Sequence, residues 1–138
     1  MPTTPRALLL RDIARSGLNS ADAQRLRFTA LSRGETQRLT KHGSESYRIP
    51  YFTPAGRITP FYRVRFFGPP TTFKKPDKET KYWQPPKTLP QLYFAPLLAW
   101  PKILVDVGTP LYITEGEKKA ARACKAGLPT IGLGGVWS

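Results

Sequence analysis

The chain has 138 residues, 40% hydrophobic and 12% aromatic, so it can form one modest folded domain but not two large ones. Its 22 lysines and arginines against nine acidic residues give a net charge of +13, which favours a polyanionic partner, nucleic acid before a membrane surface. One cysteine and one histidine exclude a disulfide framework and a structural zinc site, and no apolar run is long enough to cross a membrane, so we expect a soluble cytoplasmic protein.

The positive charge is unevenly distributed. Residues 1–90 hold 17 basic and six acidic residues, whereas residues 91–138 hold five and three. We therefore expect the polyanion-binding face in the first two thirds of the chain. A soluble protein that is merely basic is the alternative.

Two short helices are predicted at the N-terminus. Thr4 and Pro5 begin the first and Gly17 ends it, while Asn19 or Ser20 can cap a second that runs through Leu26. The outline resembles a helix-turn-helix, but such pairs more often simply pack together. Residues 32–46 are polar and are predicted to be a loop or a frayed helix, which completes a first segment over residues 1–46.

A second segment, residues 47–91, begins with a predicted β-hairpin. Residues 47–52 and 58–67 are rich in aromatic and branched side chains, and residues 54–57 between them have turn chemistry. On the second strand, alternation places Arg63 and Arg65 on one face and Val64 on the other. We expect one face to pack and the other to carry charge.

The proline-rich and lysine-rich stretch 68–91 is predicted to run extended over the surface. It is either a solvated connector or a strap that contacts phosphates, and the adjacent Tyr82 and Trp83 favour the strap. Backbone contacts should dominate, since no dedicated base-reading element is present. The predicted nucleic-acid-binding residues of this segment are Arg57, Arg63, Arg65, Lys74, Lys75, Lys78, Lys81, Tyr82 and Trp83, with Phe61 and Phe67 as further stacking surfaces.

The third segment, residues 92–138, is predicted to contain a parallel β-α-β unit. Its strands are residues 111–114 and 129–133, and its helix is residues 117–126. Glu115 follows the first strand, where open α/β sheets place ligand chemistry, and Lys118 and Lys119 could face a phosphate there. The alternative is that Glu115 merely caps the helix.

Residues 111–120 and 125–138 together look like the first half of a Toprim domain, and in particular resemble the uncharacterised domain family at the front of plasmid and phage primase-helicases. Residues 49–57 and 81–83 fit the same pattern. The resemblance implies an α+β or α/β fold in which a small helical pair and a basic hairpin lead into a partial Toprim β-α-β unit. It also implies a role in DNA replication, with Glu115 as the general acid/base or metal-site residue.

In that family Mg²⁺ or Mn²⁺ is held mainly by an Asp-x-Asp pair further along the chain, which the sequence given does not contain. We therefore expect a primase-like module that binds single-stranded or primer-template nucleic acid and is not catalytic alone. Two alternatives remain: a fragment or subunit of an active primase, or a stand-alone modulator of a helicase, a primase or a defence complex. We also expect an apolar patch near Leu133 to Trp137, exposed or buried against another molecule.

Overall fold

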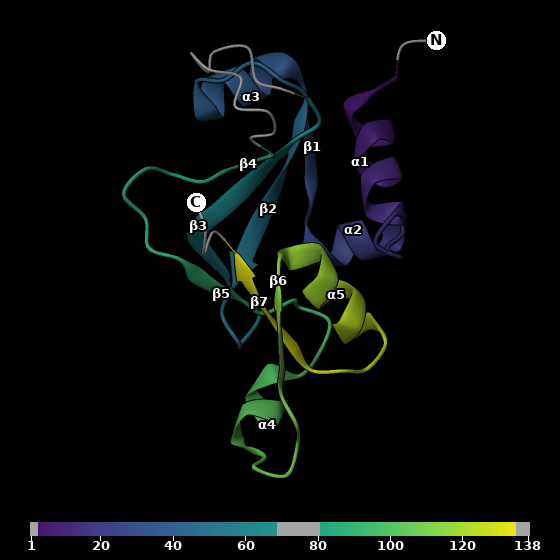
Figure 1. Cartoon of the computed structure of the whole chain (residues 1–138), viewed down its shortest axis with the longest axis vertical. Coiled ribbons are helices and arrows are strands. Elements are labelled where there is room, and N and C mark those ends of the chain that lie inside the picture. The colour runs from purple at the N-terminus through teal and green to yellow at the C-terminus, as the bar shows by residue number, and fades with distance from the viewer. Residues whose placement is uncertain (1–2, 69–80, 135–138) are drawn as a thin grey trace.

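The computed structural model of the chain describes residues 3–68 and 81–134. Within these residues the fold is mixed α+β, with five helices and seven strands arranged in two sheets (Figure 1). None of the described helices is long and apolar enough to cross a membrane.

The predicted N-terminal helix pair is confirmed. Helix α1 spans Pro5–Ala14, and the Thr4 side chain accepts a hydrogen bond from the Ala7 N–H at its start. Helix α2 spans Ser20–Leu26 and begins with a capping box, in which Asn19 and Asp22 each accept a hydrogen bond from the other's backbone N–H. These side chains satisfy N–H groups that a helix start leaves unpaired.

Helix α3, Arg33–Thr40, lies where a loop or frayed helix was predicted. Ser32 and Glu35 form a second capping box, with the Ser32 hydroxyl accepting from the Glu35 N–H and the Glu35 carboxylate from the Ser32 N–H. A hydrogen bond of 2.7 Å between the Thr36 and Ser46 hydroxyls ties the helix to the adjoining strand. Caps and this buried contact stabilise a segment whose composition is polar.

The first sheet contains the predicted hairpin and is antiparallel throughout. Its strands β1 Thr29–Leu31, β2 Ser46–Phe52, β3 Ile58–Phe66 and β4 Tyr82–Trp83 lie side by side in chain order. Strand β2 is central and is buried along most of its length. Both faces of the hairpin are therefore packed against other parts of the protein.

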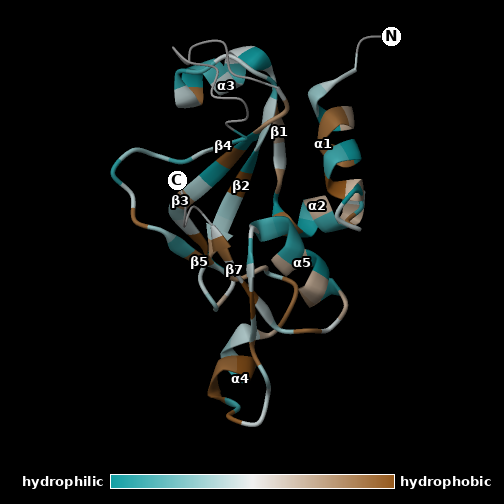
Figure 2. Ribbon diagram, in the orientation of Figure 1, coloured by the Kyte–Doolittle hydropathy of each residue, from teal (hydrophilic) through white to brown (hydrophobic). Residues whose placement is uncertain are grey.

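The second sheet contains the predicted β-α-β unit. Strands β6 Tyr112–Glu115 and β7 Thr130–Gly134 are parallel and are joined by helix α5, Glu117–Lys125. Strand β5, Gln91–Tyr93, pairs antiparallel with β7, so the order is β5-β7-β6. The short helix α4, Trp100–Val105, was not predicted and is largely hydrophobic in Figure 2.

One hydrophobic core draws on all three segments distinguished in the sequence. It includes Leu9 of α1, Tyr47 and Tyr51 of β2, Tyr93 of β5 and Ala120 of α5, each at most 1% exposed. The aromatic rings of Tyr51 and Tyr93 meet edge to face at 5.0 Å between centroids. This packing holds α5 against the hairpin and sets the environment of the charged residues on β3.

Candidate nucleic-acid interface

The face of β3 that was expected to carry exposed charge is packed, as is the opposite face, on which Val64 and Phe66 are buried. Arg63 is only 7% exposed, and Phe61 on the same face is 8% exposed and meets Tyr51 edge to face at 4.8 Å. The prediction of a solvent-facing Arg63 and Phe61 was wrong, because Glu117 of α5 and Asp12 of α1 reach the side chains on this face of the strand. Alternation distinguishes the two faces of a strand but does not say whether one or both are covered.

Arg63 is held by a buried acid at the start of α5. Glu117 is 1% exposed, and its Oε2 accepts hydrogen bonds from the Arg63 guanidinium at 3.2 Å and from the Tyr51 hydroxyl at 2.6 Å. Burial and the neighbouring Glu117 carboxylate raise the pKa of Tyr51, so its hydroxyl remains a donor at neutral pH. This cluster of Tyr51, Arg63 and Glu117 holds the β-α-β unit against the hairpin.

Arg65 and Lys118 are engaged by a second acid, Asp12 of α1. Its Oδ2 accepts from Lys118 Nζ at 2.8 Å and from the Tyr47 hydroxyl at 2.7 Å, and Arg65 lies 3.8 Å from Oδ1. Burial on its own would raise the pKa of Asp12, but the hydrogen bonds from Lys118 and Tyr47 and the nearby cations outweigh it and hold the pKa below the ordinary value. These two predicted phosphate contacts thus serve the fold.

The aromatic residues of β4 are half-buried, and the protein's own side chains occupy part of their surface. The Arg63 and Arg65 guanidinium carbons lie 4.4 and 5.4 Å from the centre of the Tyr82 ring. Trp83 packs beside Tyr62 with 6.0 Å between ring centroids. The half-buried Phe67 similarly packs on Tyr47.

Other predicted contacts do lie on the surface. Arg57 is exposed at the end of the hairpin turn, Lys81 is exposed just before β4, and Lys119 is exposed on α5. Lys74, Lys75, Lys78 and Trp137 lie outside the described residues.

Glu115 is the last residue of β6 and is exposed, as expected for the carboxyl end of a strand that leads into a helix. Gly116 follows with a φ of +88° and is the N-cap of α5, where no side chain provides a capping hydrogen bond. The second acid of the motif, Glu117, points into the core. Because the described residues contain no group of three side chains able to hold a metal ion, they do not fit a Mg²⁺ or Mn²⁺ site.

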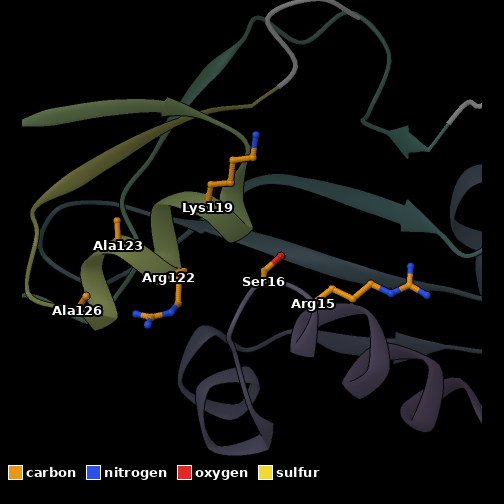
Figure 3. A pocket seen from close by; sticks show the side chains of 6 residues that line it. All are labelled: Arg15, Ser16, Lys119, Arg122, Ala123 and Ala126. Atoms are coloured by element: carbon orange, nitrogen blue, oxygen red, sulfur yellow. The ribbon is translucent and has the colours of Figure 1, made fainter.

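A surface groove that the sequence reasoning missed lies between the end of α1 and the outer face of α5. It has a volume of about 580 Å³ and is lined by Arg15, Ser16, Lys119, Arg122, Ala123 and Ala126 (Figure 3). The local signal for it was the three-residue spacing of Lys119 and Arg122, which places both on one face of a helix. The contribution of Arg15 depends on how the two helices pack.

A family model described as a domain of unknown function (DUF3854) matches residues 99–138, which include α4, β6, α5 and β7. No curated protein matches the chain, and no solved structure does.

Proposed function

We propose that the chain is a nucleic-acid-binding module of primase-like type that holds single-stranded or primer-template nucleic acid through its phosphates. The observation that carries the proposal is a net charge of +13 combined with internal pairing of the buried acids. Among the described residues, Asp12, Asp22 and Glu117 form ion pairs with Arg63, Arg65, Lys118 and Lys125. The charge excess therefore remains on other, more exposed cations.

Those cations occur on several elements. Arg11 and Arg15 are exposed on and just after α1, Lys119 and Arg122 on α5, and Arg57 beside the hairpin turn. A surface rich in lysine and arginine attracts a phosphate backbone, and the release of counterions from that backbone drives binding without base recognition. The expected activity is thus sequence-tolerant binding that weakens with salt.

The primase-like part of the proposal rests on the β6-α5-β7 unit. A parallel strand pair with an acid and a glycine at the strand-to-helix turn is consistent with a partial Toprim unit from a phage or plasmid replication protein. No catalytic step is assigned, since two-metal chemistry needs convergent carboxylates and Glu117 is already engaged by Tyr51 and Arg63.

The binding proposal is tested with two oligonucleotides of one sequence, one with phosphodiester linkages and one with uncharged methylphosphonate linkages. Fluorescence anisotropy should show binding of the charged strand and loss of most of that affinity for the neutral one. Equal affinity for both would contradict phosphate recognition. A nuclease-treated pull-down that still recovers a protein partner would instead favour the modulator hypothesis.

A second candidate function, as a subunit of a larger primase-like assembly, is favoured by the edge of the second sheet. Strand β6 lies at the end of the order β5-β7-β6, and no described strand pairs with its outer edge. Tyr112 and Ile113 on it are 47% and 68% exposed. Open edges of this kind accept further strands. This candidate predicts that hydrogen exchange at the outward β6 amides becomes slow when the remainder of a primase is added. Exchange that is unchanged by the addition would count against it.

A further inference from the structure

We infer that the groove between α1 and α5 is where the chain anchors a nucleic-acid backbone, with Arg15, Lys119 and Arg122 contacting successive phosphates. This inference rests on the proposed function and names its binding site. The sequence alone had placed the contacts chiefly on the hairpin and the proline-rich stretch.

Some of the cations on α5 form ion pairs within the protein and others do not. Lys118 and Lys125, seven residues apart, reach Asp12 at 2.8 Å and Asp22 at 2.7 Å. Lys119 and Arg122 are exposed on the same helix and form no ion pair with any described carboxylate. Lys118 and Lys125 therefore hold α5 against the N-terminal helices, whereas Lys119 and Arg122 are available to bind an external anion.

The side chains that line the groove make it strongly basic. Among the described residues, three cations and no acidic side chain line it, and Arg11 lies one helical turn before Arg15 and extends the positive surface. Like charges gathered in this way repel each other unless an anion is present. The C-terminal ends of α1 and α5 carry partial negative charge, which stabilises Arg15 just after α1 and Arg122 in the last turn of α5. Lys119 lies in the first turn of α5 and does not share this effect.

Contacts within the protein hold the groove in place before any ligand binds. The Arg122 side chain lies across the bare backbone of Gly17, where an added Cβ would come within 2.6 Å of the Arg122 Nε. Lys125 Nζ also donates to the Gly17 carbonyl at 3.3 Å, which fixes the turn after α1 against α5. A prearranged site loses less conformational freedom on binding.

The orientation of the cations favours a chain of phosphates over a single one. In Figure 3 Arg15 lies on one side of Ser16 and Lys119 and Arg122 on the other, and the charged ends of the three side chains extend in different directions. A lone phosphate is best held by donors that converge on it, whereas a backbone presents phosphates at intervals along its path. The groove therefore suits a single strand better than a mononucleotide.

The test compares the double variant Lys119→Gln/Arg122→Gln with the control Arg6→Gln/Lys102→Gln. The control removes the same charge from exposed positions on α1 and α4. Each phosphate contact contributes about 0.7 to the slope of log affinity against log salt for single strands. Loss of two contacts should make the slope less steep by about 1.4. If wild type and variant bind oligo(dT) equally at 1 M salt, the variant should then bind about 25-fold more weakly at 0.1 M salt. The control should change affinity by less than about twofold, because exposed charges far from the contact are screened.

A measurement on the unaltered protein keeps the test independent of folding defects in the variant. In ¹H–¹⁵N spectra, oligo(dT) should shift the side-chain Nε–H signals of Arg15 and Arg122 and leave that of Arg6 nearly unchanged. If wild-type protein binds oligo(dT) but the double variant behaves like the control, the groove assignment is overturned while the proposed function stands. If wild-type protein does not bind, both fall. Shifts of equal size with dTTP at the same concentration would overturn the backbone assignment.

Discussion

Replacing Glu117 by Gln tests whether the buried cluster at the start of α5 organises the fold. The amide keeps the shape of the carboxylate and an oxygen that can accept from Tyr51, but it removes the charge 3.2 Å from Arg63. At that separation and an effective dielectric constant of about 20, the attraction between the charges is about 5 kcal/mol before the cost of burying them. The side chains of Arg63 and Glu117 are only 9% and 1% exposed, so the remaining arginine charge would be left largely unsolvated.

We expect Glu117→Gln to lower the free energy of unfolding by about 3–5 kcal/mol, the usual cost of removing one partner of a buried ion pair. Urea unfolding followed by intrinsic fluorescence at neutral pH measures this. The double variant Glu117→Gln/Arg63→Met should recover at least half of the loss, because the uncompensated charge is gone. A single variant within about 0.5 kcal/mol of wild type would refute a structural role for the pair, since surface changes alone have effects of that size.

Three further predictions concern stability. The pKa of Asp12 in the folded state lies below its ordinary value of 3.8, so the stability that the ionised carboxylate contributes is present above that pH and is lost as the pH falls through the folded pKa. Below about pH 4, the melting temperature of Asp12→Asn should therefore fall less steeply with pH than that of wild type. Parallel curves would count against this. Gly132→Ala should lower the free energy of urea unfolding by about 1–3 kcal/mol, because the added Cβ would meet the Gly116 carbonyl oxygen at 2.9 Å. Gly34→Ala on α3, where the added methyl is unobstructed, should instead raise it by up to about 1 kcal/mol. Equal effects of the two variants would contradict the packing described. Ser32→Ala should cost about 1 kcal/mol by removing the α3 cap, and an unchanged unfolding midpoint would show that the cap is dispensable.

The elements that could be predicted from the sequence are those with local signals. Thr4-Pro5 and Asn19 begin helices, and residues 53–57 form the hairpin turn, because caps and turns depend on neighbouring residues. Helix α3 has such a signal too, in Ser32 and Glu35, but its polar composition concealed it. The parallel unit around α5 was recognisable from its order of strand, glycine turn and helix.

The functional assignment of individual cations could not be predicted in the same way. The residues of the Arg63–Glu117 pair are 54 positions apart, and those of the Lys118–Asp12 pair are 106 apart. Only the packed structure shows that these cations are engaged, and only the docking of α5 beside α1 brings Arg15 near Lys119. Sequence identifies a surplus of positive charge, but tertiary contacts decide which members of it are available to a ligand.

The salt dependence of single-strand binding tests the central claim most directly. The affinity of the wild-type chain for oligo(dT), measured by anisotropy over a potassium chloride series, should fall linearly on logarithmic axes. The expected slope is about −2 or steeper, corresponding to three or more phosphate contacts. An affinity that does not change across the series, or no binding at low salt, would contradict the account of this protein as a phosphate-binding nucleic-acid module.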